Sequence, residues 1–360
     1  MENRPGLRHG GIDLAALTCQ SVINDATPRL RPLTAPTGFD APIQIAECAD
    51  VLFLPNVLAK GQGVCLFRDT IIPIESILDA ETLDFIRPRW PQSETGAAYL
   101  QPFDVAYSDQ TVVILGNVFS RNFTHWLEEM FKVALLEAMG LRCLYVFADL
   151  PAFTITILQA LGIEPIRMIH PSKPTLFRSA LFTPAVTYDT LPQLPVAPVL
   201  LRQALLEPLA GLQSRFSKRL WLERGTASHN GGQTLNKDAV HACLADYGFD
   251  VVDMMDLSFQ DQLITVKGAE ILAFPHGSSL AHMLFVPPRT AIIECFAPDH
   301  VNPSLSTCRV LGHRYHQIVS RSHSLDPYAH KRDLVVDVEH LRLTLDHLTG
   351  NLPPLIPPVE

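Results

Sequence analysis

The chain has 360 residues, of which 47% are hydrophobic and 18% are charged, and its formal net charge at pH 7 is −9. This composition is typical of a globular protein and excludes a disordered chain. The acidic balance, without any cluster of Lys and Arg, excludes a nucleic-acid partner, because proteins that bind a phosphate backbone concentrate basic residues. The length exceeds what one hydrophobic core usually serves and therefore predicts two domains.

The cysteines and the first residues indicate the compartment. There are seven cysteines and no C-x-x-C pair, so neither a disulfide framework nor a zinc site is predicted. The first apolar stretch is interrupted by polar residues such as Asp13 and Gln20, which argues against a signal peptide or a membrane span. We therefore expect a cytoplasmic protein.

The N-terminal half reads as an irregular segment over residues 1–40, followed by a domain over residues 41–200. Short apolar runs up to about residue 110 favour short strands and loops. Beyond them, apolar runs alternate with segments of helical periodicity, which predicts the order β-α-β-α-β. Strands are expected at 111–115, 144–147 and 166–169; helices are expected at 125–139, between an N-cap at Thr124 and Gly140, and at 153–161.

A second series of this kind follows a proline cluster and predicts a second domain over residues 201–325, with a strand, a helix and a Pro-rich tail over 326–360. Strands are expected at 219–223, 250–252, 270–274 and 291–296, and helices at 237–247, capped by Asn236, at 258–268, capped by Ser258, and at 279–285. Strands that alternate with helices predict an α/β fold with two Rossmann-like parallel sheets.

Three polar segments follow strands of the second series. Ligands bind parallel sheets at the carboxyl ends of the strands, so Arg224, the segment 276–279 and Glu294 should lie on one edge. A glycine and small hydroxyl residues at a helix start leave N–H groups open to an anion, which fits a nucleotide diphosphate with Arg224 as its partner. Alternatively, Gly277 only makes a tight turn, and Ser278 or Ser279 caps the helix.

A polar stripe lies on the otherwise apolar helix at 125–139. Helical spacing places His125, Glu129 and Lys132 on one face. Ionisable groups are costly to bury unless paired or used, and a histidine near a helix N-terminus suits a neutral general base. The stripe equally fits a solvent-facing surface.

The absence of G-x-S-x-G, H-E-x-x-H and G-x-G-x-x-G motifs argues against a serine hydrolase, a zinc protease and an NAD-dependent oxidoreductase.

Taken in order, these segments resemble glycosyltransferase family 61, from about residue 110 to residue 340. No single segment is specific, but their shared order is. The segments are Asn122-Phe-Thr-His125-Trp with its later Glu129, the strand ending at Arg224, Asn236 at a helix start, Ser258-x-x-x-Gln262, Phe274-Pro-His276-Gly277-Ser278-Ser279 with Phe285 and Pro287, and the strand that contains Glu294.

The resemblance implies a GT-B-like architecture, with a donor/acceptor cleft between two Rossmann-like domains. It implies inverting transfer from a nucleotide sugar to a saccharide or lipid-linked saccharide, as in surface polysaccharide or capsule biosynthesis. Neither a cofactor nor an obligate metal is implied, and the enzyme would be cytoplasmic with transient contact to the inner membrane. The implied donor-binding residues are Arg224, Asn236, His276, Gly277, Ser278, Ser279 and Glu294, with Glu294 at the ribose or a nearby group; His125 or Glu129 would face the acceptor, and one of them would be the base.

Two departures from the family pattern stand out. Residues 231–234 lack the second arginine that family members commonly carry before the asparagine, and Ser279 replaces the second glycine of the turn. The missing arginine favours the alternative of a non-catalytic nucleotide-sugar-binding protein of the same fold. Hydrolysis of the donor would distinguish a transferase from such a binding protein.

Overall fold

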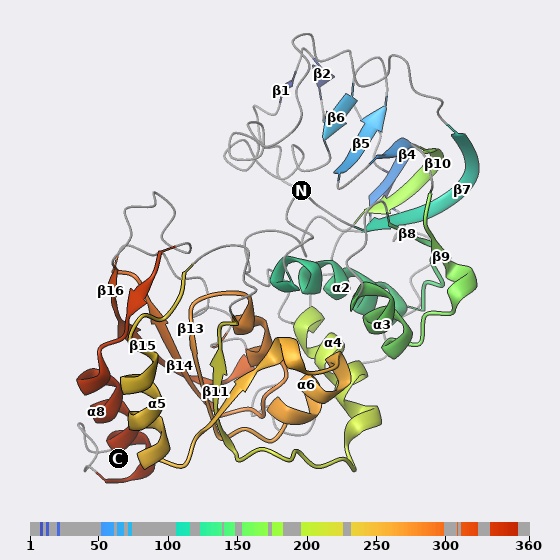
Figure 1. Ribbon diagram of the computed structural model, residues 1–360. Helices are drawn as coiled ribbons and strands as arrows, with labels where there is room; N and C mark the ends of the chain where they lie inside the picture. Colours follow the sequence, from blue (N-terminus) through green and yellow to red (C-terminus); the bar gives the residue numbers. More distant parts are fainter. Residues whose placement is uncertain are drawn as a thin grey trace, which may run out of the picture. The chain divides into compact units, whose positions relative to one another are not determined.

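A computed structural model of the chain forms two compact units, Met1–Ala35 with Pro42–Ala204 and Pro36–Ala41 with Leu205–Glu360 (Figure 1). Each unit contains its own β-sheet. The structure describes residues 8–9, 12–13, 20–21, 52–60, 63–67, 71–73, 106–115, 123–138, 140–147, 153–171, 175–182, 196–225, 232–298, 308, 311–322 and 332–351.

The first unit is built on a mixed eight-stranded sheet. Its parallel part has the order β10 (Thr175–Phe182), β7 (Ala106–Leu115), β8 (Tyr145–Phe147) and β9 (Met168–Ile169). The antiparallel part adds β4 (Leu52–Lys60) beside β10, then β5 (Gly63–Phe67) and β6 (Ile71–Pro73), with β3 (Gln20–Ser21) on β4. A separate pair joins β1 (Arg8–His9) to β2 (Ile12–Asp13).

The predicted β-α-β-α-β order of this unit is confirmed. Helix α2 (Phe123–Ala138) connects β7 to β8, and α3 (Phe153–Ala160) connects β8 to β9. Thr124 lies inside the first turn of α2, so the prediction that it caps the helix is wrong. Gly140 ends the helix as expected: it adopts a φ of +78°, and its N–H donates to the Glu137 carbonyl.

Strand β9 is shorter than predicted because a 3-10 turn, η4 (Pro165–Arg167), occupies the first part of the expected strand. Proline has no N–H for a sheet ladder and a fixed φ that suits a helical first turn. Beyond β10, α4 (Val196–Leu206) and the 3-10 turn η6 (Glu207–Leu209) lead into the second series of strands.

The second unit contains a five-stranded sheet in which every neighbouring pair is parallel. Its spatial order is β12 (Asp250–Asp253), β11 (Arg219–Glu223), β13 (Ile271–Pro275), β14 (Ala291–Phe296) and β15 (Arg314–Val319). Numbered along the chain, this order is 2-1-3-4-5. The protein therefore has an α/β fold with two parallel sheets of four and five strands, consistent with Rossmann-like domains.

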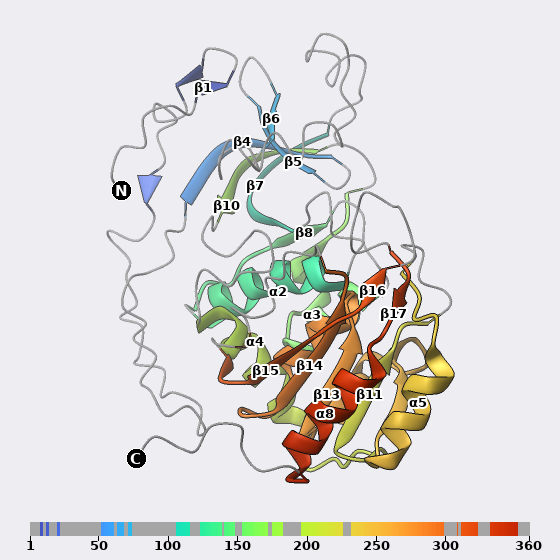
Figure 2. The same cartoon turned by 90° about the vertical axis from the view of Figure 1, so that its left-hand side faces the viewer.

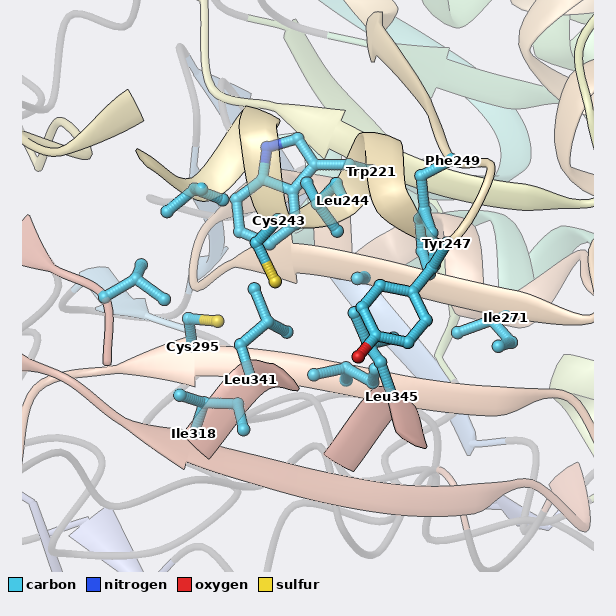
Figure 3. Close-up of a cluster of buried hydrophobic side chains, with 14 of the residues drawn as sticks. Trp221, Cys243, Leu244, Tyr247, Phe249, Ile271, Cys295, Ile318, Leu341 and Leu345 are labelled. Atoms are coloured by element: carbon cyan, nitrogen blue, oxygen red, sulfur yellow. The ribbon is translucent and has the colours of Figure 1, made fainter. Parts of the chain in front are cut away.

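Helices α5 (Lys237–Asp246) and α8 (Val338–Thr349) lie side by side on one face of this sheet (Figure 2). Their apolar residues meet the sheet in one buried cluster, in which Trp221 lies near Cys243 and Leu244 while Leu341 and Leu345 approach from α8 (Figure 3). All residues of β13 and β14 are buried, as expected for parallel strands covered on both faces. Cys143, Cys243, Cys295 and Cys308 are free and buried.

The start of α5 is tied to the start of α8. Thr234 and Leu334 form an isolated parallel bridge between the two preceding segments. The Asn236 side chain donates to the Val336 carbonyl and accepts from the Val336 N–H, both at 2.9 Å. Asn236 occupies the N-cap position of α5 as predicted, but its side chain makes no capping bond to that helix. Its amide instead holds two helix starts together.

Helix α6 (Phe259–Val266) begins as predicted, because the Ser258 hydroxyl accepts from the Asp261 N–H. The next helical segment differs in kind: η8 (Ser278–Leu284) is a seven-residue 3-10 helix. No helix among the described residues is long and apolar enough to cross a membrane. A short antiparallel pair, β16 (Arg321–Ser322) and β17 (Leu334–Val335), precedes α8.

Candidate functional site

The candidate site is at the carboxyl edge of the five-stranded sheet, where β11 and β13 end side by side. The chain runs from β11 to β12 on one side of it and then crosses to β13 on the other side. The direction in which strands are added to the sheet therefore reverses at β11. Ligands of open α/β sheets bind at this kind of topological switch point. Arg224 directly follows β11, while His276 and Gly277 directly follow β13. The strand order thus brings together two segments that lie about fifty residues apart in sequence.

Arg224 lies against the loop that follows β13. Its Nη1 donates to the His276 carbonyl at 3.0 Å, and a Cβ on Gly277 would lie 3.5 Å from the guanidinium carbon. Burial lowers the pKa of Arg224, an effect opposed by the negative charge of Asp333. A guanidinium remains protonated in proteins. The switch point therefore holds a partly desolvated cation, which forms stronger hydrogen bonds to an anion than an exposed one does.

A second acidic side chain fixes the main chain at Arg224. Glu223 Oε1 accepts from the Arg224 N–H at 3.1 Å and lies 3.3 Å from Lys237 Nζ. Its Oε2 lies 2.8 Å from His241 Nε2 and 3.3 Å from Trp221 Nε1. Glu223 thus joins the end of β11 to the first turns of α5. Glu223 could not be found from the sequence, because its partners come together only in the folded unit.

Glu294 lies within β14 and is completely buried. Its Oε1 lies 2.5 Å from His276 Nδ1, and its Oε2 accepts from the Tyr315 hydroxyl at 2.7 Å. The His276 N–H donates to the Cys295 carbonyl, so both the ring and the backbone of His276 are held. Burial and the nearby Glu294 charge raise the pKa of Tyr315 well above its usual range, which keeps the phenol protonated and donating. Both carboxylate oxygens of Glu294 are thus engaged inside the protein.

This geometry bears on the expected role of Glu294 and brings in Tyr315, a residue that was not predicted. We expected Glu294 to contact a ribose or a nearby group, whereas its oxygens bind His276 and Tyr315 under a covered surface. Tyr315 was missed altogether, because β15 was not predicted. The signal that could have found it is a weak one, namely the strand-favouring residues Tyr315, Ile318 and Val319 within this short segment.

The two serines after Gly277 start η8, but neither occupies its N-cap position, which belongs to Gly277. The alternative that Ser278 or Ser279 caps this helix is therefore wrong. The hydrogen bonds of a 3-10 helix are also less well aligned than those of an α-helix, which weakens its dipole. An anion at this position would consequently depend on side chains such as Arg224 more than on a helix dipole.

His282 lies in η8 and is almost completely buried. Its Nδ1 lies 3.1 Å from the Ser279 carbonyl, and its Nε2 lies 3.0 Å from Gln262 Oε1. The Gln262 amide in turn donates to the carbonyls of Met254 and Leu257. This chain of contacts joins η8, α6 and the turn after β12. Burial lowers the pKa of His282 from 6.5 to about 4, against a smaller opposing effect of the Ser279 carbonyl.

We predict that His282 makes the protein less stable as the pH falls. The folded-state pKa is below the unfolded one, so between about pH 6.5 and pH 4 the unfolded chain binds more protons. The free energy of unfolding should fall by up to about 3 kcal/mol across this interval, since one pKa unit corresponds to about 1.4 kcal/mol. Urea denaturation at pH 7 and pH 4.5 should show a smaller drop for His282→Gln than for the wild type; equal drops would contradict the assignment.

The sequence-predicted residues of the first unit lie on α2. Glu129 and Lys132 are buried, and Lys132 Nζ lies 2.9 and 3.1 Å from the two carboxylate oxygens of Glu129. A solvent-facing stripe is therefore wrong for this pair, which forms a buried ion pair. His125 is in the first turn of α2, four residues before Glu129, so the two positions share a helix face. Trp126 beside it is fully buried.

Within the part of the chain that the structure describes, no group of three or more His, Cys, Asp and Glu side chains is arranged to hold a metal ion. The clusters that are present are hydrogen-bonded pairs and triads such as Glu294 with His276 and Tyr315.

The fold and the site define an α/β protein with an arginine and a glycine turn at the switch point of its five-stranded sheet. The family model of Glycosyltransferase 61 matches residues 123–293, from the start of α2 into β14. The chain thus carries a glycosyltransferase family 61 domain, which confirms the resemblance seen in the sequence. Membership of this family implies sugar transfer, with a sugar donor and an acceptor as substrates. No match is found among curated proteins.

Proposed function

We propose that the protein is an inverting glycosyltransferase of GT-B architecture that uses a nucleotide-sugar donor. The observation that carries this proposal is the meeting of Arg224 with His276 and Gly277 at the switch point of a parallel sheet. The family match supports sugar transfer, and a partly buried arginine beside a glycine turn suits the diphosphate of the donor.

In the proposed reaction, the acceptor oxygen attacks the anomeric carbon as the bond from that carbon to the diphosphate breaks. The electron pair of the broken bond remains on the diphosphate, whose negative charge increases. Arg224 would stabilise this charge by donating to the diphosphate, and His276, whose Nδ1 is held by Glu294, would line the same place. Arg224 would supply the positive charge that a metal ion supplies in other transferases.

The proton of the acceptor hydroxyl goes to a general base on α2. Lys132 engages both carboxylate oxygens of Glu129, which favours a positioning role for that buried pair. We therefore assign the base to His125, which lies in the first turn of α2 and shares a helix face with Glu129. The acceptor would be a saccharide or lipid-linked saccharide of a surface polysaccharide, handled at the cytoplasmic side of the inner membrane, in line with the sequence resemblance.

The proposal is tested by thermal stabilisation and donor hydrolysis. The purified chain is mixed with UDP-, GDP-, CDP- and ADP-sugars and the free nucleotides, in EDTA. We expect one nucleotide class to raise the Tm and its sugar to be hydrolysed slowly, with His125→Asn retaining the Tm shift and losing turnover. A Tm shift without hydrolysis or transfer would support the nucleotide-sugar-binding alternative, which the missing second arginine favours. No shift with any nucleotide would contradict the donor site.

A further inference from the structure

The turn after β12 lies at the same sheet edge as Arg224, one strand further along. Asp253 ends β12, which pairs with β11 in register up to Glu223. Asp253 Oδ1 accepts from the Met255 N–H at 2.9 Å and thereby caps the 3-10 turn η7 (Met254–Asp256). Its Oδ2 approaches Gly225 so closely that a Cβ there would lie 2.4 Å away. No side chain or N–H of the described residues donates to this oxygen.

Hydrogen bonds from α6 hold this turn in place. The Gln262 amide donates to the carbonyls of Met254 and Leu257, and His282 contacts the oxygen of the same amide. Met254 packs inward with 5% of its surface exposed, whereas Met255 is 77% exposed. Among the described residues of the second unit, Met255 is the most exposed large apolar side chain. A well-anchored turn thus exposes an apolar side chain next to a partly exposed carboxylate whose Oδ2 faces Gly225.

We infer that this turn is the nucleoside subsite of the donor, in which Asp253 accepts a hydrogen bond from a ribose hydroxyl and Met255 packs on the base. The inference rests on the proposed function, because the diphosphate at Arg224 sets the position of the nucleoside. Neighbouring strands are about 4.8 Å apart, so the ends of β13 and β12 are separated by about 10 Å. A nucleoside diphosphate laid across the end of β11 covers this span, with its phosphates toward β13 and its ribose toward β12.

The chemistry of the two side chains fits this ligand. A carboxylate at the end of a parallel strand is a good acceptor for ribose hydroxyls, and Glu223 and Glu294 have both oxygens engaged elsewhere. Because Gly225 has no Cβ, Asp253 Oδ2 can lie close to the residue that follows Arg224. A methionine side chain is flexible and polarisable, so it packs well against the face of an aromatic ring.

The test is titration calorimetry of the full chain with two ligands: the best-binding nucleoside diphosphate from UDP, GDP, CDP and ADP, and inorganic pyrophosphate. Asp253→Asn keeps the oxygen that caps η7 and should bind the nucleotide 5- to 30-fold more weakly. Met255→Ala should weaken it 3- to 10-fold. Both variants should bind pyrophosphate as the wild type does. Leu343→Ala, which shortens an exposed apolar residue on α8, is the matched control and should change neither affinity.

The outcomes separate this inference from the proposed function. Wild-type nucleotide affinity in both Asp253→Asn and Met255→Ala, with weakened binding of both ligands in Arg224→Ala, would overturn the nucleoside subsite and leave the diphosphate site standing. Failure of the wild type to bind either ligand would refute the diphosphate site and the subsite with it. Removal of the 2′- or 3′-hydroxyl from the nucleotide should weaken binding to the wild type and have little further effect in Asp253→Asn. If Asp253→Asn does not fold, Met255→Ala decides.

Discussion

Replacing Arg224 with Ala is expected to lower kcat/KM for sugar transfer by at least about 100-fold and to remove the Tm shift caused by nucleotides. Loss of one preorganised donor to a developing oxyanion typically costs 10²- to 10³-fold in rate. Arg224 also contributes a full positive charge in a partly buried place, where burial lowers its pKa and strengthens its attraction for an anion. The donor is attracted in both the ground state and the transition state, so both KM and kcat should suffer.

Arg224→Lys separates charge from geometry. A lysine keeps the positive charge but lacks the planar guanidinium group, which can donate to the His276 carbonyl and to a phosphate at the same time. We therefore expect Arg224→Lys to retain only part of the wild-type activity. Arg215→Ala is the matched control, because Arg215 is exposed and stacks on Phe216 away from the switch point. Initial rates and urea denaturation should be measured for all three. A near-wild-type kcat/KM in folded Arg224→Ala would remove the main support for the donor site.

The order of strands and helices was predictable where a local pattern decides it. The apolar runs of β11, β13 and β14, and the Ser258 cap of α6, fold as their own sequences indicate. Thr124 was assigned wrongly because a capping residue type fits several positions near a helix start. Asn236 was placed correctly at the N-cap of α5, but the partner of its side chain could not be predicted. Asn236 bonds to Val336, one hundred residues later in the chain, instead of to its own helix.

The candidate site was predictable in part for the same reason. Residues that follow parallel strands share an edge, so Arg224 and His276 could be placed on one edge of the sheet from the sequence. Only the pairing of β11 with β13 makes them neighbours. The orientation of Glu294 could not be predicted, because it depends on which strand lies beside β14. That neighbour is β15, in which only Ile318 is buried and the remaining residues are partly or fully exposed. Its weak apolar pattern hid both the strand and Tyr315.

Replacing Glu294 with Gln is expected to lower kcat by roughly 10- to 100-fold while the KM for the donor changes less than about threefold. Substituting a group that orients a functional histidine typically has an effect of this size. The ionised carboxylate accepts from His276 Nδ1–H, whereas a glutamine can turn either its oxygen or its NH₂ toward that nitrogen. The tautomer and the orientation of the His276 ring would then no longer be fixed.

Tyr315→Phe distinguishes this role from simple packing. It removes the hydrogen bond to Glu294 Oε2 but leaves the carboxylate charge and the contact with His276, so we expect a loss in kcat of less than about fivefold. Both variants disturb the same buried carboxylate and should lower the Tm, because a buried polar group left without its partner costs about 1–3 kcal/mol. A purely structural role would reduce activity in step with the loss of folded protein. A fall in kcat for Glu294→Gln at temperatures where it is fully folded, with Tyr315→Phe close to the wild type, is therefore the result that identifies Glu294 as the residue positioning His276.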